Sequence, residues 1–186
     1  MKRIFDLILS SILILLFFWL FFIIGIIVKF SSKGPMIYWS SRVGRNNIIF
    51  KMPKFRTMKL DTPDIATHLM KNSHEFLTPI GGFLRRYSFD ELPQLFSIIK
   101  GDMSFVGPRP ALFNQEDLIN LRTNQGINQL LPGVTGWAQI NGRDNMTIPK
   151  KVDFDLEYLN KQSFLFDVKI IIKTISKVLI RENVSH

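Results

Sequence analysis

Residues 7–28 read LILSSILILLFFWLFFIIGIIV, an uncharged apolar stretch of about 22 residues. A helix of this length extends about 33 Å, which is enough to cross the hydrocarbon core of a bilayer. The stretch exceeds the apolar part of a typical signal peptide, and no small-residue cleavage pattern precedes Lys29. A soluble protein that buried so aromatic a helix on all sides would have to be far larger. We therefore expect residues 1–29 to form a membrane-inserted helix.

Basic residues flank this stretch at both ends, and their placement bears on its topology. Lys2 and Arg3 precede it, and Lys29 and Lys33 follow it. Because basic residues are retained on the cytoplasmic side, the pattern favours a helix that enters the bilayer and returns to the same face. A single crossing with the N-terminus outside is the alternative. Both arrangements leave residues 30–186 as a cytoplasmic domain.

The whole chain has 186 residues, a net charge of +9, no cysteine and three histidines. This length accommodates one domain besides the apolar segment. The lack of cysteine excludes disulfides, thiolate nucleophiles and cysteine-containing zinc sites, so a bound metal would need oxygen ligands. We expect His68 and His74 to be surface residues, and His186 lies at the chain end.

The remaining sequence predicts an α+β fold in which helices dominate. Two β-prone runs, Met36–Val43 and Ile48–Phe55, surround a turn rich in glycine and asparagine and predict a short hairpin. Further helices are expected from Ser88 to near Gly101 and over Glu116–Leu131. The stretch 132–143 is dense in glycine and predicts a loop-rich core around these helices.

The last predicted helix, over residues 164–181, combines a broad apolar face with a basic stripe. The stripe recurs at every fourth residue and consists of Lys169, Lys173, Lys177 and Arg181. A core helix with a solvated lysine edge explains this amphipathic pattern. A helix lying on an anionic lipid surface explains it as well, because each basic residue there contributes about 1 kcal/mol. Given the apolar segment elsewhere in the chain, we favour the interfacial helix.

Asp90 and Glu91 are adjacent carboxylates at the expected start of a helix. Ser88 and Glu91 have the spacing of a capping box, which is a structural explanation for the acidic residues. Pro93 argues against a plain first turn, because it removes a backbone hydrogen bond and clashes with the preceding turn. Neighbouring carboxylates on a helix point in different directions, so one can act as a nucleophile while the other holds a hard cation such as Mg²⁺.

Basic residues in the surrounding sequence suit a substrate that contains phosphate. Arg109 lies between two prolines, which fix its backbone and limit the entropy lost when its fork binds an oxyanion. A single basic residue without such flanking prolines is more often a solvated surface charge. The candidates for phosphate contacts are Arg109, Arg143, Arg85, Lys54 and Arg56.

Five sequence blocks, distributed over nearly the whole chain, resemble one protein family. They are KRIFD (2–6), KFRTM (54–58), SFDELPQL (88–95), KGDMSFVGPRP (100–110) and PGVTGWAQINGR (132–143). Together and in this order they closely resemble the bacterial sugar transferases called small monotopic phosphoglycosyl transferases, which are polyprenyl-phosphate phosphosugar transferases. The chain looks like the minimal catalytic unit of that family.

The resemblance implies transfer of a phosphosugar from a UDP-sugar to undecaprenyl phosphate with release of UMP, the first membrane step of bacterial glycan biosynthesis. It implies that Asp90 is the nucleophile that forms a covalent aspartyl-phosphosugar intermediate, and that Glu91 binds an Mg²⁺ cofactor. It also implies a location at the bacterial inner membrane, with the catalytic domain on the cytoplasmic face. Family members usually carry a Ser-Pro pair within the apolar segment, where this chain has Phe18-Trp19. A helix without that proline is able to span the bilayer instead of returning.

Two other functions are compatible with parts of this pattern. A membrane-tethered basic protein that binds nucleic acid or acidic lipid would explain the positive charge. Such a protein has no use for the pair Asp90 and Glu91, so no nucleic-acid partner is expected. An inactive scaffold of a glycan-assembly complex would explain the family resemblance, although the carboxylate pair is complete.

Overall fold

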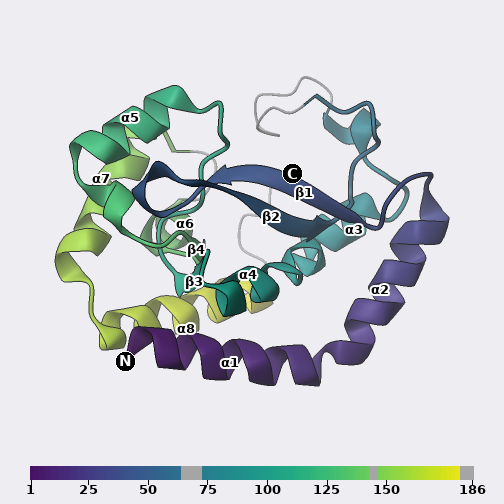
Figure 1. The fold of residues 1–186 in the computed structure, drawn as a ribbon, viewed down its shortest axis with the longest axis horizontal. Coiled ribbons are helices and arrows are strands. Elements are labelled where there is room, and N and C mark those ends of the chain that lie inside the picture. The colour runs from purple at the N-terminus through teal and green to yellow at the C-terminus, as the bar shows by residue number, and fades with distance from the viewer. Residues whose placement is uncertain (64–72, 143–145, 181–186) are drawn as a thin grey trace.

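The computed structural model describes residues 1–63, 73–142 and 146–180. Helices dominate, and they are accompanied by an antiparallel hairpin and a parallel strand pair, which confirms the expected α+β class. Figure 1 shows the hairpin lying across one face of the molecule. Helix α1 runs along the lower edge of this view and α2 rises beside it.

The predicted hairpin is present as β1 (Ile37–Val43) and β2 (Ile49–Phe55), which pair antiparallel. The connection between them contains a short 3₁₀ turn, η1 (Arg45–Asn47). Phe50 and Met52 are buried on the inner face of β2, and Lys54 follows at the same two-residue interval. The alternation of the strand therefore places Lys54 on the face that covers the core.

The apolar segment forms two helices, α1 (Lys2–Leu16) and α2 (Phe18–Ser31), whose directions differ by 64°. Within the described part of the chain no single helix is long and apolar enough to cross a membrane, and α1 and α2 reach that length only as a bent pair. The continuous helix permitted by the absence of proline is therefore not formed. The ring of Phe21 packs against Phe55 and Phe96, at centroid distances of 6.1 and 5.6 Å, so contacts with the body redirect the chain.

The N-terminus is attached to the other end of the chain. The Lys2 ammonium forms a 2.6 Å ion pair with Asp167 in α8 (Phe164–Ile180) and donates a 2.8 Å hydrogen bond to the carbonyl of Val106. The buried carboxylate of Asp6 accepts a 3.3 Å hydrogen bond from the backbone N–H of Phe105. Helix α1 consequently packs along α4 (Gln94–Lys100). Membrane insertion of α1 and α2 stays a prediction.

Two strands that the sequence analysis did not anticipate, β3 (Ser104–Val106) and β4 (Gly133–Thr135), form a parallel pair. Helix α5 (Glu116–Asn124) is shorter than the helix expected over Glu116–Leu131. It ends because Gly126 adopts a φ of 72°, after which a 3₁₀ turn, η5 (Ile127–Gln129), continues the chain.

The glycine-dense stretch 132–143 was expected to be loop, but it contains β4 and a short helix, α6 (Trp137–Asn141). Helix α7 (Ile148–Lys161) follows and packs against both α5 and α6. The chain then closes with α8, which confirms the predicted C-terminal helix as far as Ile180. Arg181 lies outside the described residues.

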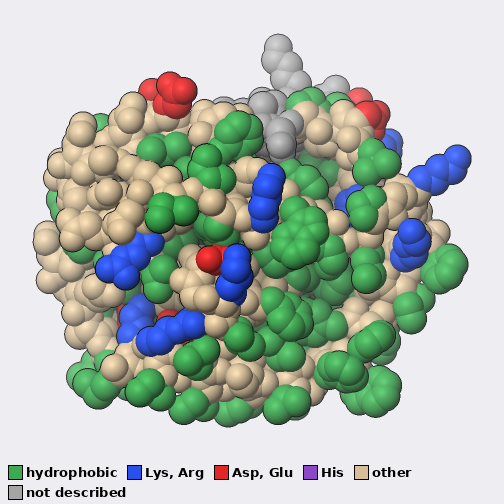
Figure 2. Space-filling view, in the orientation of Figure 1, with side chains coloured by type: hydrophobic (Ala, Val, Ile, Leu, Met, Phe, Trp, Pro, Cys, Tyr) green, Lys and Arg blue, Asp and Glu red, His purple; other side chains and the backbone are tan. Residues whose placement is uncertain are grey.

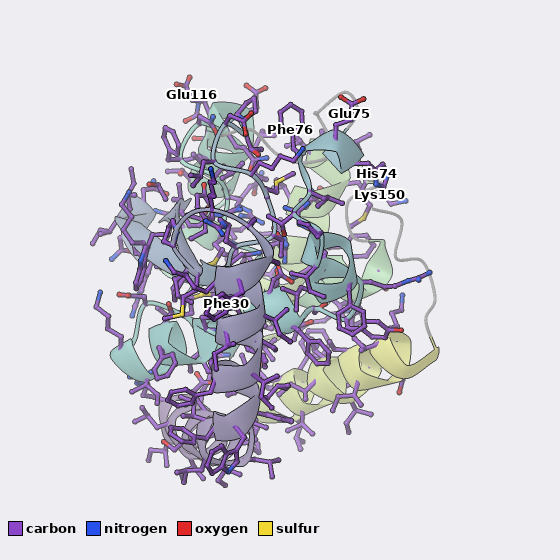
Figure 3. All side chains as sticks on the ribbon, turned by 90° about the vertical axis from the view of Figure 1, so that its right-hand side faces the viewer. Phe30, His74, Glu75, Phe76, Glu116 and Lys150 are labelled. Atoms are coloured by element: carbon purple, nitrogen blue, oxygen red, sulfur yellow. The ribbon has the colours of Figure 1, made fainter. Side chains whose placement is uncertain are left out.

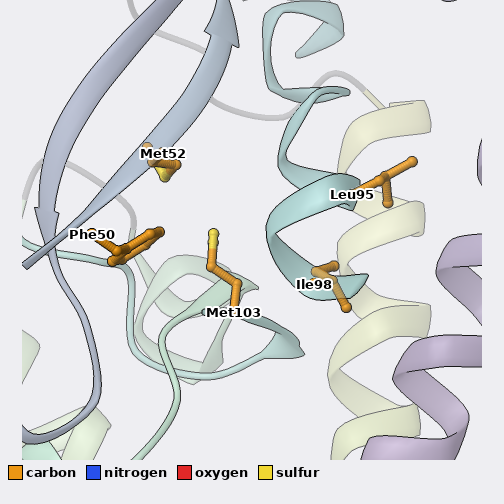
Figure 4. Packing of buried hydrophobic residues seen from close by; sticks show 5 residues of the cluster. All are labelled: Phe50, Met52, Leu95, Ile98 and Met103. Atoms are coloured by element: carbon orange, nitrogen blue, oxygen red, sulfur yellow. The ribbon is translucent and has the colours of Figure 1, made fainter. Parts of the chain in front are cut away.

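Two hydrophobic clusters fix the hairpin against the helices. The first, shown in Figure 4, joins β2 and α4 and consists of Phe50, Met52, Leu95, Ile98 and Met103. The second joins α2 to β2 and to α3 (Gly81–Arg86), and it consists of Ile24, Val28, Phe55 and Leu84. Residues 1–29 thus share a core with the rest of the chain, and both clusters border the segment between α3 and α4.

Exposed apolar side chains gather along the edge formed by α1 and α8. Figure 2 shows hydrophobic side chains along the lower rim, where α1 lies. Those of α1 include Ile4, Ile8, Ile12 and Leu15, and those of α8 include Leu165, Ile172, Ile175 and Val178. In α8 the opposite side is buried through Asp167 and Ile170. The interfacial position of α8 stays a prediction.

Figure 3 views the side of the molecule on which α2 lies and labels Phe30, which is exposed at the end of that helix. The same view labels His74 in the 3₁₀ turn η3 (Ser73–Phe76). His74 is exposed, as expected. His68 and His186 lie outside the described residues.

Candidate active site

The segment between α3 and α4 presents the two adjacent carboxylates. Asp90 and Glu91 belong to a 3₁₀ turn, η4 (Phe89–Glu91), and α4 begins only after Pro93. The capping box, one of the two explanations of the acidic residues, is not formed, because Ser88 makes no side-chain capping bond and adopts a left-handed backbone with a φ of 57°. Pro93 explains the arrangement, since a residue without N–H is tolerated where a helix starts but not within its interior.

The two carboxylates point into different environments, as adjacent positions of a helical turn do. The Asp90 side chain is buried, with 6% of its surface exposed. Burial is the largest cause that raises the pKa of Asp90 to about 6, and the Glu91 charge adds to it. The positive charges of Lys54, Arg85 and Arg109 act in the opposite direction. Asp90 therefore titrates only about one pH unit below neutrality, although three positively charged side chains surround it.

Glu91 is held by two cations on one of its oxygens. Lys54 Nζ lies 2.7 Å and an Arg109 terminal nitrogen lies 3.3 Å from Glu91 Oε1. Burial disfavours the Glu91 charge, but the attraction and hydrogen bonds of Lys54 and Arg109 outweigh it and hold the pKa of Glu91 well below its usual range. The neighbouring carboxylates thus differ in protonation as well as direction: Glu91 stays ionised throughout the physiological pH range, whereas Asp90 takes up a proton as the pH falls toward 6.

Arg85 reaches the same region from α3. Its Nε donates a 3.0 Å hydrogen bond to the Thr57 hydroxyl, and burial lowers the pKa of its guanidinium while the charges of Asp90 and Glu91 raise it. The structure thus brings three of the five predicted phosphate-binding residues, Lys54, Arg85 and Arg109, to the carboxylate pair.

Arg56 is placed differently from the other candidates. Its guanidinium donates to the backbone carbonyls of Ser32 and Lys33 at 2.7 and 2.8 Å, and only 4% of the residue is exposed. These bonds clamp the turn that joins α2 to β1, so the described contacts give Arg56 a structural task. Arg143, the remaining candidate, lies outside the described residues.

The surroundings of Glu91 fit a Mg²⁺ ion that would be bound jointly by this carboxylate and by the substrate phosphates. Mg²⁺ in enzymes of phosphate compounds usually takes one or two protein carboxylates and completes its shell with water and substrate phosphates. Among the described residues no cluster of three His, Asp or Glu side chains exists that would hold a metal by itself. The two cationic contacts that described residues make with Glu91 fall on Oε1, so Oε2 is the atom that would hold a metal. Because Lys54 and Arg109 repel a cation, the anionic substrate and the metal should bind together.

Two arginines that the sequence analysis did not single out as site residues contact the loop that carries Arg109. Arg122 of α5 donates to the Arg109 carbonyl at 2.8 Å, and Arg42 of β1 donates to the Pro110 carbonyl at 3.1 Å. Neither lies in a pattern that predicts such a contact, because both contacts arise only where α5 and β1 pack against the loop in the folded chain.

Comparison with known proteins places these observations in a family. A family profile described as bacterial sugar transferase matches residues 1–181. The chain is 39% identical over 185 residues to UDP-glucose:undecaprenyl-phosphate glucose-1-phosphate transferase of Escherichia coli, covering 95% of this chain and 40% of that protein. It is 37% identical over 195 residues to undecaprenyl-phosphate glucose phosphotransferase of Komagataeibacter xylinus, covering 98% of this chain and 36% of the relative.

A shorter relative matches over most of its own length. The exopolysaccharide production protein ExoY of Rhizobium meliloti is 40% identical over 195 residues, which cover 95% of this chain and 84% of that protein. The chain therefore corresponds to less than half of the two larger relatives and to nearly all of the smaller one.

Proposed function

The chain belongs to the bacterial sugar transferases, and on that premise we propose that it transfers a phosphosugar from a UDP-sugar to undecaprenyl phosphate and releases UMP. The observation that carries this proposal is the pairing of a buried Asp90 with a Glu91 held by Lys54 and Arg109. Phosphoryl transfer depends chiefly on positioning and on neutralising phosphate charge, and this cradle offers both.

The first step uses Asp90 as the nucleophile. An Asp90 oxygen attacks the phosphorus that bears the sugar, the bond from that phosphorus to the bridging oxygen breaks, and UMP leaves with the bonding electrons. Arg109 and Lys54 bind the diphosphate oxygens, and Arg85 supports the developing charge from α3. A bound Mg²⁺, held by Glu91, would supply further neutralisation of the diphosphate.

The second step frees the enzyme. A phosphate oxygen of undecaprenyl phosphate attacks the same phosphorus, the bond to Asp90 breaks, and the carboxylate is restored. The product is undecaprenyl-diphospho-sugar, and no oxidant or further co-reactant is required. The covalent route allows one site to bind a soluble donor and then a lipid acceptor in turn.

We assign the catalytic domain to the cytoplasmic face of the bacterial inner membrane, with α1 and α2 entering the bilayer and returning. Support comes from Lys2, whose ion pair with Asp167 keeps the N-terminus on the body of the protein. The exposed apolar side chains of α1 and α8 lie along one edge, where a lipid surface would cover them. A lipid acceptor requires such a position, because its polyprenyl tail stays in the bilayer.

The reaction is tested by measuring UMP release from purified protein in nanodiscs with undecaprenyl phosphate, Mg²⁺ and a panel of UDP-sugars. We expect UMP from at least one donor, loss of it in Asp90→Asn and on EDTA addition, and retention in Asp153→Asn, which removes an exposed acid on α7. A folded wild-type protein that releases no UMP with any donor would contradict the proposal.

The covalent step has its own test. With a sugar-labelled donor and no acceptor, we expect about one equivalent of UMP and one equivalent of label on the protein. UMP that forms only when both substrates are present would instead indicate direct transfer.

The topology is tested with a cysteine added at the N-terminus. Because the chain contains no cysteine, this thiol is the only site for a maleimide. In spheroplasts, a membrane-impermeant maleimide should label it only after the inner membrane is permeabilised. Labelling of intact spheroplasts would place the N-terminus outside.

A further inference from the structure

Four hydrogen bonds to its backbone carbonyls, donated by three different elements, hold the loop that carries Arg109. The carbonyl of Pro108 accepts a 2.9 Å hydrogen bond from the N–H of Gly133, and that of Ala111 accepts a 3.0 Å bond from the N–H of Val43. Between them, Arg122 donates to the Arg109 carbonyl at 2.8 Å and Arg42 donates to the Pro110 carbonyl at 3.1 Å. The four consecutive carbonyls of residues 108–111 are therefore bound by β4, by α5 and, at the last two positions, by β1.

The sequence of the loop makes its carbonyls the main groups by which its backbone can be attached to the rest of the protein. Pro108 and Pro110 have no N–H, so this segment offers mainly acceptors for attachment to the rest of the protein. The prolines fix φ at their own positions but leave the position of the loop as a whole undetermined. Donors from surrounding elements must set it. Two of the four donors are side chains, and both are arginines.

Arg122 is itself immobilised by a buried partner. Its Nε and one terminal nitrogen lie 2.9 and 2.6 Å from Asp155 Oδ2 in α7, and the Asp155 side chain is 2% exposed. Helices α5 and α7 lie side by side in Figure 1. With two nitrogens on Asp155, the planar guanidinium directs its remaining terminal nitrogen at the Arg109 carbonyl. Burying an ion pair contributes little net stability compared with apolar packing, so its geometry is the feature to explain.

We propose that Arg122, oriented by Asp155, and Arg42, from β1, are positioning residues that set the Arg109 fork against the substrate phosphates. This rests on the proposed function, because Arg109 is the group through which they act. The Arg109 side chain is 43% exposed and lies 3.3 Å from Glu91, and the carbonyl bonds fix the backbone position from which its fork extends. A loop already held in position loses less entropy when the diphosphate binds.

The test is a double-mutant cycle with Arg122→Lys and Arg109→Ala, measured as kcat/KM for UMP release. A lysine keeps the charge beside Asp155 but cannot hold that carboxylate with two nitrogens while donating to the Arg109 carbonyl. We expect Arg122→Lys to lower kcat/KM about tenfold in the wild-type background and to have no effect in the Arg109→Ala background. Arg45→Lys, an exposed arginine in η1, is the matched control and should leave kcat/KM unchanged.

The outcomes separate the two hypotheses. An equal loss from Arg122→Lys in both backgrounds, or no loss in either, overturns the positioning role. Normal kcat/KM in Arg109→Ala overturns the role of Arg109 in the proposed function instead. Thermal unfolding of each variant shows whether it is folded. If Arg122→Lys does not fold, Arg42→Lys takes its place in the same cycle, with the same expected non-additivity.

Discussion

The clearest quantitative expectation concerns Asp90→Asn, which should stabilise the protein while abolishing its activity. The pKa of Asp90 is raised from 3.8 to about 6, chiefly by burial. One pKa unit corresponds to 1.36 kcal/mol, so the rise of about two units means that the Asp90 charge costs about 3 kcal/mol of folding free energy. That figure already includes the attraction of Lys54, Arg85 and Arg109.

The pH dependence follows from the direction of the shift. Between about pH 4 and pH 6 the native protein keeps a proton on Asp90 that the unfolded chain has lost, so stability falls as the pH rises through this range. Above it the cost is complete. Asparagine is neutral at every pH and has the same shape as aspartate. Among the described residues no side-chain hydrogen bond contributes to the pKa of Asp90, so the substitution removes no such bond. The advantage of Asp90→Asn should be near zero at pH 4 and about 3 kcal/mol above pH 7.

The assay is thermal unfolding in detergent, followed by the fluorescence of the three tryptophans. For a chain of this size, about 3 kcal/mol corresponds to a rise in Tm of about 6–12 °C, expected in full at pH 8 and reduced to about half at pH 5. Asp153→Asn, at an exposed position, should show no difference between the two pH values. A Tm for Asp90→Asn that is raised equally at both pH values, or lowered at pH 8, would refute the electrostatic reasoning.

Three further predictions concern the same network. The kcat/KM for UMP release should rise about tenfold per pH unit below pH 6 and level off above it, because the raised pKa of Asp90 limits the fraction of the nucleophile that is ionised. A profile that is flat from pH 5 to 8 would exclude Asp90 as the titrating group. Lys54→Met should lower kcat/KM about 100-fold, because it removes from the proposed phosphate site a cation that lies 2.7 Å from Glu91. Retention of activity would show that Arg109 suffices. Lys2→Met should destabilise the protein by about 3 kcal/mol, because the buried Asp167 loses its cationic partner and, among the described residues, keeps only the side-chain hydrogen bond from Tyr158. Adding Asp167→Asn should recover part of the loss in thermal unfolding; a double variant less stable than Lys2→Met would contradict this.

The hairpin and the terminal helices were predictable because each carries a long pattern. Phe50 and Met52 are buried on one side of β2, and Lys54 follows at the same two-residue interval, which places it at the site. The strands β3 and β4 have three residues each, and they exist because residues 104–106 and 133–135 meet across a long sequence separation. No local pattern of that length distinguishes a strand from a loop. Similarly, one glycine, Gly126, decided where α5 ends.

The residue types of the candidate site were predictable from the sequence, but the contacts between them were less so. Lys54 and Arg56 lie two residues apart in one basic block, yet Lys54 binds Glu91 and Arg56 clamps the turn after α2. The chain leaves β2 at Phe55, so the alternation that carries Lys54 to the core face no longer governs Arg56. The tasks of Arg122 and Asp155 depend on α5 and α7 packing together, which follows from tertiary structure alone.

The bend between α1 and α2 shows how a helix pair can be redirected without proline. Phe18-Trp19 stands where relatives were expected to break the helix with Ser-Pro, and the break nevertheless falls at Phe17. Contacts at three places enforce it: Lys2 on Asp167 at the start, Phe21 against Phe55 and Phe96 after the bend, and Val28 in the core cluster at the end. A straight helix could not satisfy both ends at once. In the proposed membrane arrangement the return to the cytoplasmic face is therefore determined by the docking of the pair on the catalytic domain. A proline at this position would make the bend easier without being its cause.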